Sequence, residues 1–111
     1  MRALFPELAD HIVNELYGNL YQRAGLSLRE RVLISIAVLA TDGLVPQLNY
    51  QLRFALLAGA SGCEIREVLL HVGLFSGLAK AINAAGILHQ VETELRTPEP
   101  NDRFDERAQK S

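Results

Sequence analysis

Apolar residues recur in pairs at every fourth position near the N-terminus of the chain. A four-residue spacing places such pairs on one face of an α-helix and predicts an amphipathic helix. We expect this helix over residues 6–23, because Pro6 suits a first helical turn and Gly25 suits the end. The pairs are Leu4/Phe5, Leu8/Ala9, Ile12/Val13, Leu16/Tyr17 and Leu20/Tyr21.

The next apolar stretch follows a helix start signal. Ser27 lies three residues before Glu30, and this spacing is typical of a capping box, in which each side chain bonds the other residue's backbone N–H. From Val32 to Ala40 the chain is apolar on every side of a helix apart from Ser35. Such a helix is typical of the centre of a core or of a subunit interface. We expect it to end at residues 41–43, Thr-Asp-Gly.

Three further helices follow, and no segment predicts a strand. The first is expected over residues 46–58, between a proline and a glycine. The second starts with another capping box, formed by Ser61 and Glu64, and the last covers about residues 78–95. The sequence therefore predicts an all-α fold of about five helices.

The chain divides into a helical domain and a short tail. Its 111 residues suit one domain, which at this size buries roughly two-thirds of its unfolded-chain surface. We assign residues 1–96 to the helical domain. Residues 97–111 contain two prolines and many charged side chains, so we expect a flexible tail or one that lies on a neighbouring subunit.

Composition narrows the class of protein. Hydrophobic residues make up 49% of the chain, more than a small monomer readily buries, so we expect a homo-oligomer. The net charge of −2 gives no basic face for nucleic acid. The longest apolar run is far shorter than the ~20 residues that span a bilayer, and the N-terminus does not resemble a secretion signal. We therefore expect a cytoplasmic protein with neither nucleic-acid nor membrane partners.

Candidate chemistry is sparse. Glu67 and His71 are spaced i,i+4 on one helix face, so the carboxylate is placed to orient the imidazole as an acid or base, although such pairs are also ordinary on solvated faces. Arg31 and Arg53 flank apolar stretches and suit either substrate carboxylates or surface ion pairs. The single cysteine, Cys63, excludes an intrachain disulfide, and no metal-ligand motif is present, so we expect no metal and no cofactor.

Two stretches resemble the carboxymuconolactone decarboxylase family, whose fold is alkylhydroperoxidase-D-like. They are LYGNLYQRAGLSLRERVLISIAVLA, residues 16–40, and PQLNYQLRFALLAGASGCEIREVLLHVGLFSGLAKAINA, residues 46–84. The resemblance implies an all-helical trimer or hexamer. It also implies loss of CO2 from 4-carboxymuconolactone, in aromatic catabolism, without a cofactor. In that reaction the lactone carbonyl accepts the electron pair, while the protein anchors the substrate, stabilises the oxyanion and supplies a proton.

The chain departs from this family at known reactive positions. The peroxidase branch has a glutamate, two cysteines and a histidine where this chain has Val32, Leu44, Gln47 and Gln51. Thiol peroxidase activity is therefore not expected. The decarboxylase branch usually also has a histidine at the position of Gln51. Glutamine donates a hydrogen bond to an oxyanion but does not shuttle a proton near neutral pH.

Two functional hypotheses follow. In the first, the protein is a carboxy-lyase in which Gln51 donates to the oxyanion, Arg31 and Arg53 anchor substrate carboxylates, and His71 or Glu30 is the acid. Glu30 is also explained by its capping box alone, and Gln51 by a polar corner of a buried helix. In the second, the chain is a ligand-binding scaffold of the same fold without catalysis. Whether His71 shares a cavity with Gln51 distinguishes the two.

Overall fold

The computed structural model describes residues 6–96, and every regular element in that range is helical, as predicted. The prediction of a tail at residues 97–111 lies outside the described residues. None of the described helices is both long enough and apolar enough to cross a membrane. The elements are α1 (Pro6–Ile12), the π-helical turn η1 (Val13–Tyr17), the 3-10 turn η2 (Leu20–Gln22), α2 (Leu28–Asp42), α3 (Val45–Leu57), α4 (Gly62–Ser76) and α5 (Leu78–Arg96).

Both predicted capping boxes are confirmed. The Ser27 hydroxyl accepts from the Glu30 amide at 3.1 Å, and the Ser27 amide donates to the Glu30 carboxylate at 2.8 Å. The corresponding distances between Ser61 and Glu64 are 3.0 and 2.9 Å. These bonds satisfy backbone donors that a helix start leaves free, so the sequence locally fixes where α2 and α4 begin. At its other end α2 stops at Gly43, whose φ of 71° favours glycine.

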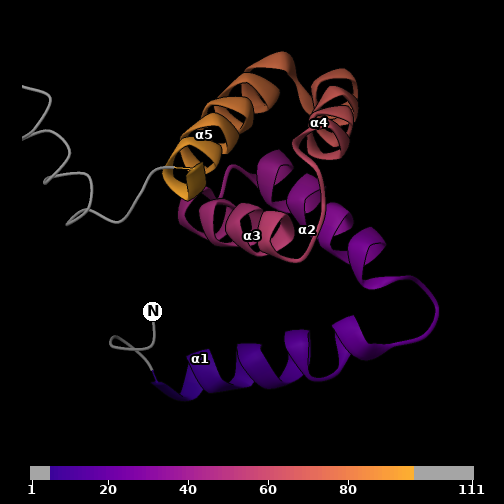
Figure 1. Ribbon diagram of the computed structural model, residues 1–111. Helices are drawn as coiled ribbons and strands as arrows, with labels where there is room; N and C mark the ends of the chain where they lie inside the picture. The colour runs from indigo at the N-terminus through magenta and orange to yellow at the C-terminus, as the bar shows by residue number, and fades with distance from the viewer. Residues whose placement is uncertain (1–5, 97–111) are drawn as a thin grey trace, which may run out of the picture.

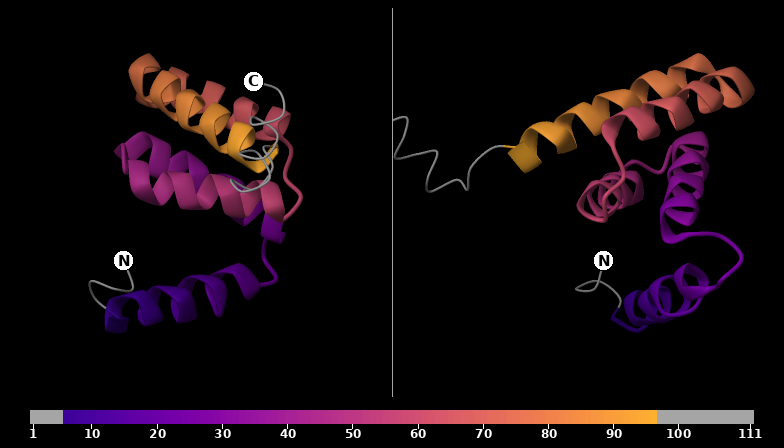
Figure 2. Two further views of the ribbon diagram at one scale, coloured as in Figure 1. Left: turned by 60° about the vertical axis from the view of Figure 1, so that its left-hand side comes forward. Right: turned by 45° about the vertical axis from the view of Figure 1, so that its right-hand side comes forward.

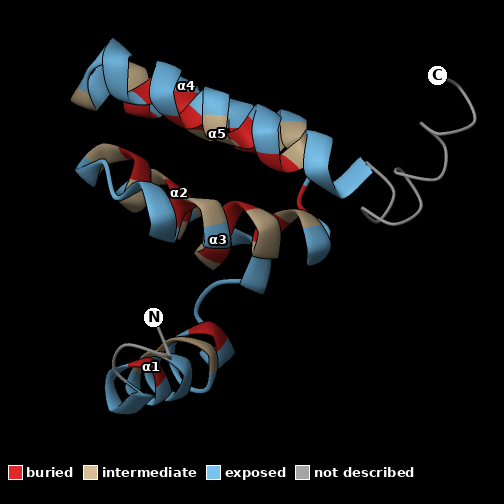
Figure 3. Cartoon of the chain, turned by 90° about the vertical axis from the view of Figure 1, so that its left-hand side faces the viewer, coloured by how far each residue is buried: buried red, intermediate tan, exposed pale blue. Residues whose placement is uncertain are grey.

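Helices α2–α5 form two layers, which we call the body. The hairpin of α4 and α5 lies across the pair formed by α2 and α3 (Figures 1 and 2). The buried residues of each helix face the other layer, and their exposed faces point outward (Figure 3). The most completely buried side chains are those of Ile36, Leu52, Ala55, Ile65, Leu88 and Val91.

Residues 6–22 form an arm on the side of α2 and α3 that faces away from the hairpin (Figures 1 and 3). The prediction of one continuous helix over residues 6–23 was wrong. The α-helix ends at Ile12, a π turn follows, and Gly18 and Asn19 separate it from η2. Glycine and asparagine are poor helix formers. At Gly18 a Cβ atom would lie 2.6 Å from the Asn14 carbonyl oxygen, so the chain passes closely here only because the residue is glycine.

Candidate functional site

An apolar cleft of about 760 Å³ lies between the arm and the α2–α3 layer, and we call it the arm cleft. Its volume is in the range of small-molecule sites. Aliphatic side chains from the arm and α2 make up most of its wall, and α3 contributes polar groups. The lining residues are Ala9, Ile12, Val13, Leu16, Tyr17, Leu20, Ile34, Ser35, Val38, Leu39, Gln47, Tyr50 and Gln51.

Gln51 is the centre of the hydrogen bonds at this cleft. It is the only buried polar residue described, at 7% exposed. Its carbonyl oxygen accepts from the Tyr21 hydroxyl at 3.2 Å, and its amide nitrogen donates to the Tyr17 hydroxyl at 3.5 Å. Tyr21 also lies 2.6 Å from the Ser35 hydroxyl, and either oxygen can donate in this bond. The Arg31 carbonyl, 3.1 Å from the Ser35 hydroxyl, is the acceptor of the Ser35 proton when Tyr21 donates to Ser35. Gln51 of α3 is therefore held by two tyrosine hydroxyls of the arm.

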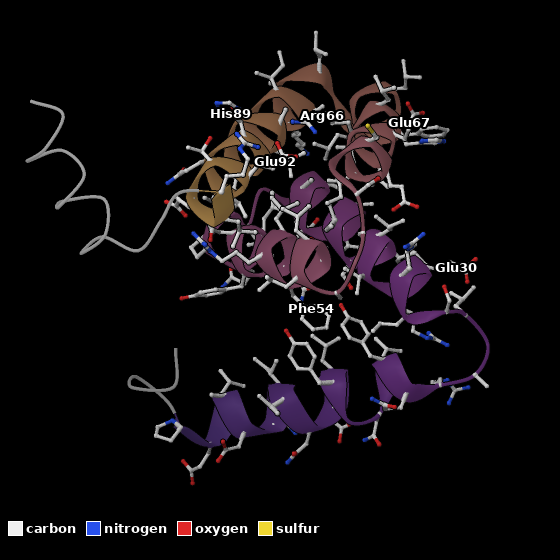
Figure 4. The ribbon with its side chains drawn as sticks, in the orientation of Figure 1. Glu30, Phe54, Arg66, Glu67, His89 and Glu92 are labelled. Atoms are coloured by element: carbon white, nitrogen blue, oxygen red, sulfur yellow. The ribbon has the colours of Figure 1, made fainter. Side chains whose placement is uncertain are left out.

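Three aromatic rings attach the arm to α3 at the same point. Tyr17 meets Tyr21 edge to face at 5.5 Å between ring centroids, and it meets Phe54 in the same manner at 5.2 Å. Tyr21 stacks on Phe54 at 5.9 Å. Figure 4 shows Phe54 pointing from α3 toward the arm. Such pairs contribute about 0.5–1.5 kcal/mol each beyond their buried area, so this cluster largely determines where the tyrosine hydroxyls lie.

Burial raises the pKa of Tyr21 above its ordinary value. The phenol therefore stays protonated near neutral pH and acts as a hydrogen-bond donor rather than as a base.

Two donors at the cleft remain available to a ligand. The Tyr17 hydroxyl accepts from Gln51, and no residue in the described part of the chain accepts its own proton. The Gln51 amide has two N–H groups, and one of them is directed at Tyr17. The other N–H also has no acceptor in the described part of the chain. A phenol O–H and an amide N–H that lie side by side suit a carbonyl oxygen or an oxyanion.

The lining of the arm cleft carries no formal charge. Aspartate, glutamate, histidine, lysine and arginine are all absent from the residues that surround it within the described range. In the same part of the chain, no three histidine, cysteine or carboxylate side chains come together as a metal site requires. The groups available for chemistry are thus hydroxyls and amides.

The structure does not bring His71 to Gln51 within one chain. His71 is exposed on α4, a helix of the layer farther from the arm (Figure 1), and its ring stacks on Phe75 at 6.4 Å between centroids. Its Nδ1 lies 3.2 Å from the backbone oxygen of Glu67, so the contact between these two residues runs through the backbone and not through the carboxylate. Figure 4 shows Glu67 on the outer side of α4. An acid role for His71 stays a prediction.

Glu30 and Arg31 lie at the start of α2, outside the cleft lining. Figure 4 shows Glu30 at the end of the helix near the arm connection, where its carboxylate closes the capping box with Ser27. One Arg31 amino group donates to the Arg23 carbonyl at 3.4 Å. The buried Arg31 Nε has no partner in the described part of the chain. Arg31 lies one helical turn before Ser35, which lines the cleft.

Arg53 and Cys63 also lie outside the cleft. Arg53 donates to the Asn49 side chain at 3.0 Å and pairs with the Glu94 carboxylate of α5, so it joins α3 to α5. Cys63 is exposed near the start of α4. Of the five predicted site residues, only Gln51 lines the cleft.

Three residues of the site were not singled out from the sequence: Tyr17, Tyr21 and Ser35. The two tyrosines appeared as members of the apolar stripe, and Ser35 as an interruption of an apolar run. The signal that was available is their polarity. A hydroxyl placed on an otherwise apolar face needs a partner when it is buried, and here the three hydroxyls and Gln51 supply one another.

Comparison with known proteins finds one family model and several relatives that match most of this chain. The family model described as "Carboxymuconolactone decarboxylase family" matches residues 6–90. The chain is 31% identical over 96 residues to an uncharacterized 15.0 kDa protein from the nqo9-nqo10 intergenic region of Paracoccus denitrificans, which covers 85% of this chain and 72% of that protein.

Two relatives are named for an activity. The 4-carboxymuconolactone decarboxylase of Acinetobacter baylyi is 37% identical over 76 residues, which are 68% of this chain and 54% of the relative. The nitrosuccinic acid decarboxylase npaB of Metarhizium robertsii is 29% identical over 68 residues, which are 61% of this chain and 48% of the relative. The match thus spans about half the length of each named decarboxylase.

Proposed function

The chain belongs to the carboxymuconolactone decarboxylase family, and from this premise we propose that it decarboxylates a small carboxylic acid, bound in the arm cleft, without a cofactor. The observation that carries the proposal is the pair of free donors, the Tyr17 hydroxyl and the Gln51 amide, on the wall of an apolar cleft.

The donors match the charge that develops in the reaction. When the bond between the α-carbon and the carboxylate breaks, CO2 leaves and the electron pair stays on the α-carbon. A neighbouring carbonyl takes this charge onto its oxygen, where Tyr17 and Gln51 donate hydrogen bonds to it. Water at the cleft mouth returns one proton to the carbon. Each step balances without an oxidant or a metal.

The apolar wall supports the same step. A carboxylate in a cleft lined by Ile34, Val38 and Leu39 loses much of its hydration. The transition state spreads that charge over the forming CO2 and the carbonyl. The uncharged wall therefore destabilises the transition state less than it destabilises the bound carboxylate. Gln47 and Gln51, which occupy two of the peroxidase branch's reactive positions, both line this cleft.

The test is CO2 release from 4-carboxymuconolactone and from nitrosuccinic acid, the compounds for which two relatives are named. We expect Gln51→Ala to lower kcat by about 10²-fold, as the loss of one oxyanion donor does elsewhere. Gln90→Ala is the matched control, because Gln90 is exposed on α5 and its side chain bonds Glu94, also exposed and outside the cleft. His71→Ala and His89→Ala form a second pair, and an effect confined to His71 supports its predicted acid role. No release of CO2 from either of these dicarboxylic acids, nor from a β-oxo monocarboxylic acid, by a well-folded protein counts against the proposal.

One observation favours the alternative, a scaffold that binds a ligand without turnover. The cleft lining has no side chain that titrates near neutral pH, so in a single chain no acid or base other than water reaches the ligand. Saturable binding of a substrate analogue without any CO2 release is the result expected for this alternative.

We also propose that copies of the chain associate through the exposed apolar residues where α4 meets α5. Leu74 and Phe75 are 86% and 85% exposed, and Leu70, Leu78 and Ile82 extend the same surface. Apolar surface of this extent is typical of protein–protein contact. Light scattering at a series of protein concentrations tests this association. Leu74→Asp is expected to give monomers. Leu57→Asp, which replaces an exposed leucine on α3, is expected to leave the association unchanged. A cytoplasmic location remains a prediction.

A further inference from the structure

We propose that the arm cleft selects an acid whose only charge is the carboxylate it loses: a β-oxo monocarboxylic acid with an apolar body. This inference rests on the proposed decarboxylase function, but it concerns the charge of the ligand rather than the rate of the reaction. It separates this chain's substrate class from that of a dicarboxylate such as 4-carboxymuconolactone.

The first argument is the absence of a cation from the cleft. A second carboxylate that stays on the substrate would remain desolvated among aliphatic side chains, and none of the described lining residues is basic. An unpaired buried charge carries a penalty of several kcal/mol, which falls where the site is open to solvent, as it is here. The carboxylate that leaves as CO2 loses its charge during the reaction, so the penalty applies only before the bond breaks.

The second argument is that neither arginine expected to anchor carboxylates lines the cleft. Arg53 pairs with Glu94 between α3 and α5. One Arg31 amino group donates to the Arg23 carbonyl, and the Arg31 Nε, which has no partner in the described part of the chain, is buried outside the cleft lining.

The third argument is the match between the polar groups and one carbonyl. Two free donors, from Tyr17 of the arm and Gln51 of α3, lie next to each other, and most of the remaining lining is aliphatic, from Val13 of the arm to Val38 of α2. A ligand with one carbonyl and an apolar body fills both kinds of surface, since its oxygen meets the donors while its carbons meet the aliphatic wall. The volume of about 760 Å³ leaves room for a body of several carbons beyond the reacting group.

The experiment compares two acids that differ by one charge, 3-oxooctanoate and 3-oxooctanedioate, and their decarboxylation products, heptan-2-one and 6-oxoheptanoate. CO2 release above the spontaneous rate gives kcat/KM for the acids, and calorimetry gives Kd for the products. We expect the monoacid to exceed the diacid in kcat/KM, and the neutral ketone to bind more tightly than its anionic counterpart, by at least about tenfold in each case.

A designed cation sharpens the test. Val38 lines the cleft and is 52% exposed, so Val38→Arg places a guanidinium there without burying it, and we expect it to reverse the preference toward the diacid. Val45→Arg is the matched control, because Val45 is 50% exposed but lies outside the lining, and it is expected to leave the preference unchanged.

The outcomes for the two proposals differ. A kcat/KM for the diacid equal to or above that for the monoacid overturns the charge selectivity but leaves the proposed decarboxylation intact. In that case, loss of the diacid activity in Arg31→Gln would show that Arg31 reaches the cleft. Selective binding of heptan-2-one without CO2 release from any acid supports the selectivity and counts against decarboxylation. If neither product binds and neither acid reacts, the inference is wrong.

Discussion

The body and the arm are both helical, yet they bury very different amounts of side chain. Ile36, Leu52 and Leu88 are 0% exposed where the two layers of the body meet. In the arm only Ala9 and Tyr21 are buried, and α1 approaches the rest of the chain closely only through the turns that follow it. The fold therefore depends on the body, whereas the arm depends on a few contacts that are also the walls of the site.

The largest expected effect separates the two regions by core truncation. Leu52→Ala on α3 is expected to lower the free energy of unfolding by about 2–5 kcal/mol, because it leaves a cavity between layers. Leu57→Ala on the same helix, 74% exposed, is expected to change it by no more than about 0.5 kcal/mol. Urea denaturation followed by circular dichroism measures both. If Leu8→Ala in the arm lowered the free energy of unfolding by as much as Leu52→Ala, the arm and the body would unfold as one unit.

A smaller effect is expected where the arm is attached. Phe54→Ala removes the ring that packs against Tyr17 and Tyr21, with an expected cost of about 1–3 kcal/mol. We expect faster hydrogen exchange over residues 6–22 and little change in the core of α5. Phe75→Ala is the matched control, since that ring is 85% exposed on α4. Equal exchange rates in the arm of both variants would contradict the anchoring role of the aromatic cluster.

The turn between η1 and η2 provides a third comparison. Gly18→Ala places a methyl group against the Asn14 carbonyl, so we expect it to loosen the arm at a cost of about 1–3 kcal/mol. Gly86→Ala adds the same methyl group to α5 where nothing lies within 4 Å, and it is expected to be neutral or slightly stabilising. The two variants are compared by thermal unfolding and by hydrogen exchange in the arm. A Gly18→Ala protein as stable as Gly86→Ala would show that the close approach is easily relaxed.

The smallest expected effect concerns pH and belongs to the body alone. Hydrogen bonds from the backbone and side chain of Ser27 lower the pKa of Glu30, and bonds from Ser61 lower that of Glu64. A lowered pKa in the folded state means that these bonds stabilise the fold above the unfolded carboxyl pKa of about 4.3, and that the stabilisation is lost as pH falls through the lower folded value.

The variant Glu30→Gln/Glu64→Gln keeps the capping pattern but removes both titrations. Between about pH 5 and pH 3 we expect its free energy of unfolding to fall less than that of the natural chain. Glu67→Gln, a carboxylate outside both caps, controls for the general loss of negative charge. Parallel pH dependences in all three proteins would contradict the assignment.

The sequence predicted local features of this fold well. Helix starts at Ser27 and Ser61 were found because a capping box involves residues only three apart. The break at Gly18 was missed, because the apolar stripe continues through it. The rings of Tyr17 and Tyr21 meet Phe54, which lies more than thirty residues away and sets the direction of the chain.

The residues that line the cleft were predicted only in part, for the same reason. Gln51 was identified, and it lines the cleft. Spacing along a helix shows which residues share a face, but not which other helix that face meets. His71 and Arg53 therefore came out as candidates although neither lines the cleft with Gln51. Ser35 was passed over although its hydroxyl lies beside Tyr21.

The π-helical turn at Val13–Tyr17 has a consequence for how such a site changes by insertion and deletion. A π turn accommodates one more residue than an α turn, and one residue corresponds to a rotation of about 100° around a helix. Deleting a single residue from this turn would restore α geometry and turn the α1 side chains by that angle relative to Tyr17. The wall of the cleft would then present a different set of residues, while the body, which begins at Leu28, would keep its sequence and its core.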